Sequence, residues 1–406
     1  MKRFKRYLID AMLVFFLLLT NGNPAFCQNT TSTLQQIDSV EVSLLTCGPR
    51  PNVYSLYGHT AIRFQNKSNG TDIAINYGIF SFDKPFFILR FVFGLTDYEM
   101  GIEYFSDFVS HYSASGCGIR QQTLNLTNEE KAAIAAAIDK NYAPENRVYR
   151  YNYFYDNCTT RARDILISHI KGSVIYIRPL QKGATFRSMI HQYNETHRWA
   201  RFGNDLLLGI KADRPTDRKE QQFLPQNLCK DFSSAYIQDK NGNKRKLVTS
   251  ETWVLPHTTD VGSDKFPVSP ITCMALIAII ITAASILEYI KNTFWWWIDA
   301  IIMGTTGICG LILLAMIFSK HPTVSLNLQI LLLNPITLFC AIPAIKGLKK
   351  RKITSWIRIW EVLIVMFIIG GYFQSYAEGM YFVALSLLLR YILKTIQFNK
   401  AKQNKS

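Results

Sequence analysis

The feature that most constrains this 406-residue chain is a series of five long apolar segments in its last third. They cover residues 271–290, 295–318, 326–345, 353–373 and 380–393. Each is a candidate for a helix that crosses a bilayer, which takes about 20 predominantly apolar residues. We therefore expect an all-α domain of five transmembrane helices over residues 269–395, followed by a short basic tail over residues 396–406.

The excess of basic residues lies beside these apolar segments. The formal net charge is +16, and residues 269–406 contain 13 basic but only four acidic residues. Residues 28–268 are nearly balanced, with 28 basic and 24 acidic residues. A nucleic-acid-binding protein would carry its positive charge on a folded domain, whereas Lys and Arg beside apolar segments set membrane orientation. We expect a membrane protein with no nucleic-acid partner.

Residues 1–27 have the pattern of a secretory signal peptide. Four basic residues precede an apolar run over residues 7–19, which is too short to span a bilayer comfortably. Ala25 and Cys27 place small residues at the positions that a signal peptidase requires, so we expect cleavage after Cys27. A lipid-modified Cys27 and an uncleaved anchor are the alternatives, and Phe26 disfavours lipid modification.

Export of residues 28–268 would fix the orientation of the apolar segments. Five crossings after Pro270 would leave the C-terminus in the cytoplasm. The outer loops would then hold only Lys320 and Glu378. The inner loops and tail would hold Lys291, Lys346, Lys349, Lys350, Arg351, Lys352, Lys394, Lys400, Lys402 and Lys405. This asymmetry follows the positive-inside rule and supports a multi-pass protein with an exported domain and a cytoplasmic C-terminus.

Three charged residues lie near the ends of the apolar segments: Asp299, Arg358 and Glu361. Arg358 and Glu361 are three residues apart and can pair on one helix face. We interpret all three as residues that reach the membrane surface or pair between helices.

The exported segment, residues 28–268, is long enough for one α+β domain. Alternating and β-branched residues predict strands over 40–46, 60–65, 73–78 and 86–93. Thr127 and Glu130 form a capping box that predicts a helix ending near Tyr142. The aromatic residues 149–155 favour β-structure, and an amphipathic helix follows to about Ile170. Residues 203–268 are polar and irregular, and we expect no regular structure there.

Cys158 differs from the other cysteines of the exported segment in its position. Asp156 or Asn157 would cap the following helix, so Cys158 would lie in its first turn. Free amide groups and the helix dipole favour a thiolate or an oxyanion there. From these residues alone a structural thiol remains the commoner interpretation. The remaining cysteines, which form disulfides by default in an oxidising compartment, are Cys47, Cys117 and Cys229.

A nucleophilic cysteine also needs an imidazole base. His59, at the start of a predicted strand, is the best candidate among the seven histidines. His169 lies at the far end of the helix that Cys158 begins, too far for direct contact. The sequence contains neither a glycine-rich phosphate loop nor a CxxC or HExxH pair, so we expect no cofactor and no metal.

Four stretches of the sequence resemble the exported domain of the Lnb family, the lipoprotein N-acyltransferases of Bacteroides-type bacteria. They are LLTCGP (44–49), YSLYGHTAIR (54–63), NYGIFSFD (76–83) and YFYDNCTTR (153–161). The resemblance covers most of residues 35–230, and a multi-span tail also fits the family. The order of histidine before cysteine is similar to permuted NlpC-type, papain-like folds such as the lecithin:retinol acyltransferases. The resemblance implies a papain-like α+β domain in the periplasm, attached to the bacterial inner membrane.

The resemblance also implies roles for particular residues. Cys158 would take an acyl chain from a phospholipid, and His59 would activate the thiol and move the protons. The acceptor would be the N-terminal amine of a diacylglyceryl-cysteine lipoprotein. The residue that orients His59 is not fixed by a motif; Asn76 is our first choice and Asp72 the second.

Two arginines in the motifs, Arg63 and Arg161, are candidates to bind a phosphate or carboxylate of the substrate. Alternatively, both pair with nearby acidic residues of the chain.

Two other functions stay open at this point. A phospholipase or cell-wall peptidase would use the same cysteine and histidine, although a peptidase gains little from five spans. A non-enzymatic envelope assembly or sensor protein would hold Cys158 in a disulfide. The acyltransferase explains the membrane tail best, because one helix suffices as an anchor and both lipid substrates lie at the membrane surface.

Overall fold

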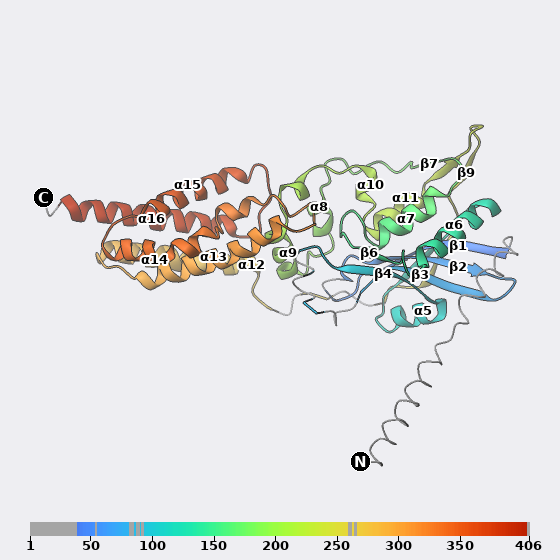
Figure 1. Cartoon of the computed structure of the whole chain (residues 1–406), viewed down its shortest axis with the longest axis horizontal. Coiled ribbons are helices and arrows are strands. Elements are labelled where there is room, and N and C mark those ends of the chain that lie inside the picture. The colour runs from blue at the N-terminus through green and yellow to red at the C-terminus, as the bar shows by residue number, and fades with distance from the viewer. Residues whose placement is uncertain are drawn as a thin grey trace, which may run out of the picture.

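A computed structural model describes residues 39–52, 55–80, 85–86, 90, 93–258, 262–263 and 266–403. The predicted signal peptide, residues 1–27, lies outside these residues. Figure 1 shows two parts placed end to end. The first is an α+β part that ends with β10 (Val248–Leu255), and the second is a helical part that runs from α12 (Pro270–Ile290) to α16 (Met380–Gln403).

The α+β part is built on one antiparallel sheet of seven strands, in the order β10-β5-β1-β2-β3-β4-β6. The other strands are β1 (Val40–Cys47), β2 (His59–Asn66), β3 (Thr71–Ile79), β4 (Asp97–Tyr104), β5 (Ile119–Leu124) and β6 (Val148–Arg150). The predicted strands over 40–46, 60–65 and 73–78 are confirmed. The strand predicted over 86–93 is wrong where that segment is described, because Phe86 and Phe93 lie in turns and Arg90 has helical backbone.

The two faces of this sheet are covered by different helices. Ile62 and Ile75 face a core shared with α6 (Asn128–Tyr142), α7 (Cys158–Ser168) and α11 (Pro225–Ser233). Ala61 and Ala74, one residue earlier on the same strands, face α5 (Phe105–Ser113). Successive strand residues point to opposite faces, so one sheet organises both cores.

The helices α6 and α7 begin at the capping residues that the sequence indicates. Thr127 Oγ1 accepts from the Glu130 amide at 3.3 Å, and the Glu130 carboxylate accepts from the Thr127 amide at 2.8 Å. Asn157 Oδ1 accepts from the amides of Thr159 and Thr160, each at 2.9 Å. Both predicted helices are therefore confirmed, and Cys158 is the first residue of α7.

Residues 203–268 contain regular structure, contrary to our expectation. They include η3 (Ile210–Asp213), α10 (Arg218–Gln221), α11, β8 (Tyr236–Gln238), β9 (Lys244–Lys246) and β10. β10 pairs with β5 at the edge of the main sheet, while β8 and β9 form a small sheet with β7 (Ser173–Ile175). The prediction was wrong because the buried residues of this segment, such as Leu228, Phe232 and Leu247, are too sparse to give a periodic signal.

The helical part also contains α13 (Trp296–Ile317), η4 (Leu328–Leu331), α14 (Ile336–Lys349) and α15 (Ser355–Gly370). In the described part of the chain four segments are long and apolar enough to cross a membrane: Pro270–Ile290, Trp296–Ile317, Leu328–Lys349 and Met380–Ala401. The remaining predicted segment forms α15, which is apolar but has 16 residues. The helical part therefore has four to five apolar helices that can cross a membrane.

The helix α16 continues to Gln403, well beyond the predicted end of the last apolar segment. Lys394, which we assigned to the loop after that segment, is instead buried with an exposed fraction of 3%. Its ammonium group lies 3.3 Å from Glu288 and 3.2 Å from Asp299. Arg390 pairs with the same two acids, at 2.9 Å and 2.8 Å. We call Glu288, Asp299, Arg390 and Lys394 the buried ionic cluster.

Asp299 therefore pairs between helices, as we interpreted it, but deep inside the bundle, where its exposed fraction is 0%. The expected pair on α15 is also present, with Arg358 Nη1 2.8 Å from Glu361 Oε2.

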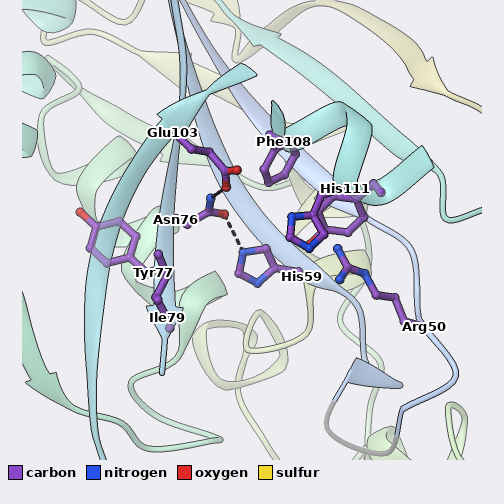
Figure 2. A pocket seen from close by; sticks show the side chains of 10 residues that line it. Arg50, His59, Asn76, Tyr77, Ile79, Glu103, Phe108 and His111 are labelled. Carbon is purple, nitrogen blue, oxygen red and sulfur yellow. Dashed lines mark hydrogen bonds between the residues drawn. The ribbon is translucent and has the colours of Figure 1, made fainter. Parts of the chain in front are cut away.

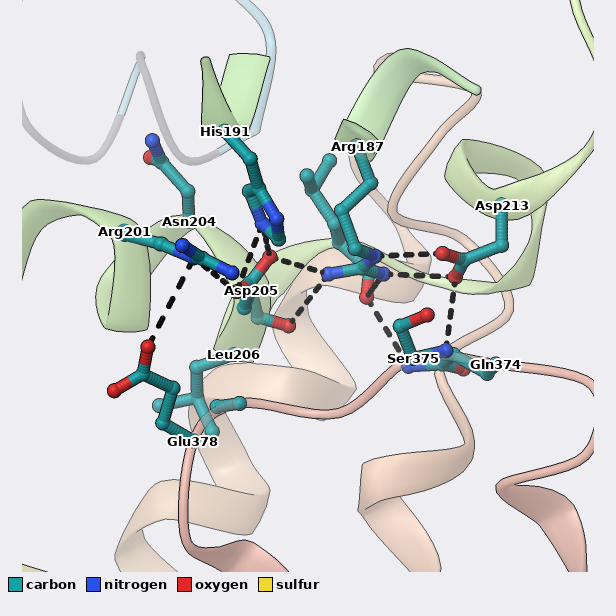
Figure 3. A network of polar contacts seen from close by, with 12 residues as sticks. Arg187, His191, Arg201, Asn204, Asp205, Leu206, Asp213, Gln374, Ser375 and Glu378 are labelled. Carbon is teal, nitrogen blue, oxygen red and sulfur yellow. Dashed lines mark hydrogen bonds and ion pairs between the residues drawn. The ribbon is translucent and has the colours of Figure 1, made fainter. Parts of the chain in front are cut away.

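The two parts contact each other through α8 (Phe186–His191), α9 (Arg198–Leu207) and η3, which we call the docking lobe. Arg187 binds the carboxylates of Asp205 and Asp213, each at 2.8 Å, and is itself buried (Figure 3). From the helical part, Gln329 Nε2 donates to the Asp205 carbonyl at 2.9 Å, and Gln374 Nε2 donates to the Leu208 carbonyl at 3.1 Å. The ionic network thus fixes the docking lobe. The helical part binds the backbone of that lobe and also its side chains, since Glu378 pairs with Arg198 at 2.7 Å and the Ser375 amide donates to Asp213 at 3.2 Å.

Candidate active site

β2 and α7 bring Cys158 and His59 together at one end of the sheet. His59 is the first residue of β2, and Cys158 is the first residue of α7. The hydroxyl groups of their neighbours Thr60 and Thr159 lie 3.0 Å apart, which ties the start of the strand to the start of the helix. As a result, the Cys158 thiol lies close enough to the His59 imidazole for each group to shift the pKa of the other.

The electrostatics of this pair favour a charged nucleophile. Burial opposes the thiolate, but the charge of His59 and hydrogen bonds from His59, Thr60 and Thr159 lower the pKa of Cys158 from 9.0 to about 7. Burial likewise opposes the imidazolium, but the charge and hydrogen bond of Cys158, with the hydrogen bond of Asn76, raise the pKa of His59 above 6.5. Each member stabilises the charged form of the other, as in a coupled nucleophile–base pair.

Asn76 bonds the imidazole of His59 (Figure 2). Its Oδ1 lies 3.0 Å from His59 Nε2, and its Nδ2 donates to Glu103 Oε1 at 2.5 Å. Asn76 thus presents its nitrogen to Glu103 and its oxygen, which can only accept, to His59. Nε2 of His59 must then carry a proton, which leaves Nδ1 to accept the proton of the thiol. This arrangement of a cysteine, a histidine and an asparagine is similar to that of papain-like enzymes.

Glu103 is a site residue that the sequence did not indicate. It lies on β4, where it pairs with Ala74 of β3, and only this strand pairing brings it beside Asn76. Asp72, our second choice to orient His59, lies at the start of β3, away from His59, and binds Arg63 instead. The geometry therefore favours Asn76, and its catalytic role stays a prediction.

Two glycines allow the chain to pass close to the reacting groups. Gly58 has a φ of +76°, and a Cβ atom there would lie 2.6 Å from the Cys47 carbonyl oxygen. Gly78 has a φ of +90°, and a Cβ atom there would lie 3.8 Å from Cys158 Cβ. Both conformations are unfavourable for residues with a side chain. The start of β2 and the end of β3 therefore depend on glycine.

The first turn of α7 also provides an amide for an oxyanion. Asn157 accepts from the amides of Thr159 and Thr160 through its side chain, and from the Arg161 amide through its carbonyl at 3.0 Å. Of the first-turn amides, only that of Cys158 itself is left without a hydrogen-bond partner among the described residues. An amide beside the nucleophile, at the positive end of a helix, suits the negative oxygen of a tetrahedral intermediate.

The two arginines predicted to bind substrate both hold carboxylates of the chain. Arg63 donates to both oxygens of Asp72, at 2.8 Å and 2.5 Å. Arg161 donates to both oxygens of Asp156, at 2.7 Å and 2.8 Å, and stacks 3.5 Å from the centroid of Tyr149. These bidentate pairs correspond to the alternative interpretation, pairing with nearby acids. Substrate binding by either arginine stays a prediction.

The described cysteines form no disulfide with one another. Burial raises the pKa of Cys47, Cys117 and Cys229 above the ordinary value, which makes these thiols unreactive. Cys158 is a free thiol whose pKa is shifted in the opposite direction. This contrast disfavours the non-enzymatic alternative, which needs Cys158 in a disulfide.

Residues 28–192 match the family model of the Lnb N-terminal periplasmic domain, and residues 262–402 match that of the Lnb transmembrane domain. The chain belongs to the Lnb family. The resemblance seen in the four sequence stretches is thereby confirmed. No curated protein and no solved structure gives a significant match. The α+β part thus contains the Lnb N-terminal periplasmic domain, and the helical part makes this a multi-pass membrane protein.

The Lnb periplasmic domain is linked to the transmembrane domain close to the site. The Lys320 amide, in the connection between α13 and η4, donates to the Phe93 carbonyl at 3.0 Å, just before β4. Tyr57, two residues before His59, accepts a hydrogen bond at 2.8 Å from Asn204 in the docking lobe. Asn204 precedes Asp205, whose carbonyl binds Gln329 of the transmembrane domain. The segment that carries His59 therefore rests on the lobe that contacts the transmembrane domain.

Proposed function

We propose that this protein is a lipoprotein N-acyltransferase that moves an acyl chain from a phospholipid to the N-terminal amine of diacylglyceryl-cysteine lipoproteins. Lnb proteins carry out this type of transfer, and the chain matches both Lnb domains. The observation that carries the proposal is the arrangement of Cys158, His59 and Asn76, in which the pKa of the thiol is lowered to about 7.

The first half-reaction forms an acyl-enzyme. The Cys158 thiolate attacks the ester carbonyl of the phospholipid, and the Cys158 amide stabilises the resulting oxyanion. When the intermediate collapses, the C–S bond remains and the C–O bond breaks. His59 protonates the departing oxygen, so a lysophospholipid leaves and His59 becomes neutral.

The second half-reaction transfers the acyl chain to the lipoprotein. The free N-terminal amine attacks the thioester, and neutral His59 takes the proton that the amine loses. A C–N bond forms and the C–S bond breaks, which gives the amide and regenerates the thiolate–imidazolium pair. Asn76 and Glu103 hold the ring in one orientation through both steps, because Asn76 bonds the nitrogen that does not exchange protons with substrate.

The attachment to the membrane supports a lipid as the acyl donor and a lipid-modified protein as the acyl acceptor. We propose that the protein lies in the bacterial inner membrane with its C-terminus in the cytoplasm, since the basic residues cluster in the inner loops. A reporter protein that works only in the cytoplasm should then be active when it is fused after Ser406, and one that works only in the periplasm should be inactive. A periplasmic signal would mean that the apolar helices cross the membrane an even number of times.

A thiol phospholipase is the nearest competing function, because water can replace the amine in the second half-reaction. The two functions share the acyl-enzyme and differ only in the acceptor. Release of free fatty acid without an N-acylated product would favour the phospholipase.

The decisive experiment is mass spectrometry of a lipoprotein's N-terminal peptide from cells that depend on this protein. We expect a third, amide-linked acyl chain with the wild type and none with Cys158→Ala, at equal abundance of the two proteins in the membrane. Cys47→Ser is the matched control, because burial makes that neighbouring thiol unreactive and its loss should affect stability at most. An unmodified amine in wild-type cells would contradict the transferase function.

A further inference from the structure

A pocket of about 270 Å³ opens beside His59 and contains an arginine that the mechanism does not use (Figure 2). Arg50 follows β1, three residues after Cys47, and lines this pocket together with His59 and Asn76. Its guanidinium carbon lies 3.8 Å from the centroid of the Tyr112 ring. This cation–π contact holds the guanidinium group at the pocket wall. The Arg50 charge is close enough to His59 to lower the pKa of the imidazole, against the stronger influence of Cys158.

Arg50 differs from the other arginines near the site in what it binds. Arg63 and Arg161 each hold a carboxylate through two hydrogen bonds. No carboxylate of the described residues lies within ion-pair distance of Arg50, and Glu103, the described acid that lines the same pocket, binds Asn76. A guanidinium group with free donors pairs best with a planar or tetrahedral oxyanion, such as a carboxylate or phosphate.

The rest of the pocket suits an anion that is attached to apolar chains. Ile79 and Phe108 give it apolar walls, and the exposed His111 of α5 adds a second nitrogen donor. Its volume of about 270 Å³ is just below the range of about 300–1,000 Å³ that encloses a drug-sized ligand. It can therefore hold a small polar group, while long acyl chains would extend outside it.

We propose that Arg50 binds the phosphate of the phospholipid donor and so positions the donor ester beside Cys158. This inference rests on the proposed acyl-transfer function. A phospholipid carries its phosphodiester on the same glycerol as its acyl esters, only a few bonds away. The acceptor carries a diacylglyceryl thioether without phosphate, and its reacting group is an amine. An anion site next to the dyad therefore fits the donor and not the acceptor.

The test measures acylation of Cys158 on the full-length protein in detergent, by intact-protein mass spectrometry. Two donors with the same acyl chain are compared: a phospholipid, and a p-nitrophenyl ester, which has no phosphate. Arg50→Gln should slow acylation by the phospholipid about 10- to 100-fold, the usual effect of losing hydrogen bonds to a charged group. Acylation by the p-nitrophenyl ester should stay within about twofold, the resolution of such a comparison.

Three further measurements sharpen this result. Arg50→Lys should recover part of the phospholipid rate, because an ammonium keeps the charge without the fork of donors. Inorganic phosphate should inhibit the wild type more strongly than Arg50→Gln. Arg147→Gln is the matched control, since Arg147 is an exposed arginine outside the pocket and its loss should change neither rate.

Each contrary outcome points to a different error. Equal loss with both donors would mean that Arg50 only supports the fold through Tyr112, and unchanged rates would mean that it binds no substrate. A defect confined to transfer from preformed acyl-enzyme to a lipopeptide amine would assign Arg50 to the acceptor. All three overturn the phosphate site. Absence of a thioester on the wild type with either donor would instead contradict the acyltransferase function itself.

Discussion

The candidate active site and the buried ionic cluster both remove charged groups from water, and they are built in opposite ways. In the cluster, Arg390 and Lys394 share the carboxylates of Glu288 and Asp299, and every member is at most 3% exposed. At the active site, Cys158 and His59 shift each other's pKa, and Arg50 lines an open pocket without a carboxylate partner among the described residues. Every charge of the buried ionic cluster is paired within the chain, whereas Arg50 at the active-site pocket is left for a substrate to pair with.

The environments explain this difference. Inside a helical domain that lies in hydrocarbon, an unpaired charge costs several kcal/mol, so only a balanced set is tolerated there. The end of the periplasmic sheet borders a pocket, where a substrate can supply the missing partner. Four experiments test whether the two regions differ in this way.

Arg390→Met should have the largest effect on stability. It leaves two carboxylates with one ammonium group in the buried ionic cluster, and loss of one partner of a buried pair costs about 3–5 kcal/mol. The midpoint of thermal unfolding in detergent should fall sharply, while the activity of the remaining folded protein should be unchanged. Arg358→Met is the matched control, because that arginine is 50% exposed and pairs with Glu361 on the same helix. A variant with normal stability but no activity would make the cluster functional and break the comparison.

The pH dependence of Cys158 alkylation should distinguish the reactive thiol from the buried ones. Since the pKa of Cys158 is lowered to about 7, its alkylation by iodoacetamide should rise with pH around a midpoint near 7, below the ordinary 9.0. At lower pH the thiol is protonated and reacts slowly. His59→Ala removes the strongest influences that lower this pKa, so the midpoint should move upward. Cys47 serves as the internal control and should stay unlabelled until the protein unfolds. A wild-type midpoint near 9 would contradict the thiolate–imidazolium pair.

Asn76→Ala should slow acyl transfer without a matching loss of stability. The imidazolium loses the acceptor of its Nε2–H group, a hydrogen bond worth about 1.5–3 kcal/mol, or about 10- to 100-fold in rate. Glu103→Gln should have a smaller effect, because a Gln oxygen can still accept from Asn76. The rate of acyl-enzyme formation, measured across pH, tests whether Asn76 orients His59. If it does, Asn76→Ala lowers the rate and also shifts its dependence on pH. Equal activity of Asn76→Ala and wild type would exclude Asn76 as the residue that orients His59.

Tyr57→Phe should have the smallest effect, because it removes one hydroxyl group between the His59 segment and the docking lobe. The loss of its hydrogen bond with Asn204 should lower the free energy of unfolding by about 0.5–1.5 kcal/mol. Activity should fall severalfold at most. Tyr155→Phe is the control, since its hydroxyl group accepts from Arg214 at an exposed position. A large loss of activity with normal unfolding would show that the transmembrane domain controls the site through this contact.

Much of the fold near the site could be predicted from short stretches of sequence. The Thr127–Glu130 capping box and the Asn157 cap act within three residues, so local sequence is enough to place the starts of α6 and α7. The same reasoning placed Cys158 in the first turn of a helix. The apolar segments could also be predicted from the sequence, because a helix that crosses a bilayer requires a long run of apolar residues. The helices and strands of residues 203–268 could not be predicted, because the apolar residues of that segment are sparse and follow no clear period.

The sequence by itself determined the two-part organisation, the helix that begins at Cys158 and the strand that begins at His59. Only the tertiary structure decided which other side chains these residues contact. Glu103 reaches Asn76 through the pairing of β3 with β4, and Lys394 reaches Glu288 because α12 packs against α16. It also decided that Arg63 and Arg161 hold carboxylates, while Arg50 lines the pocket. The physical reason is that hydrogen bonds and ion pairs act over a few ångströms in space, whichever residues the fold brings there.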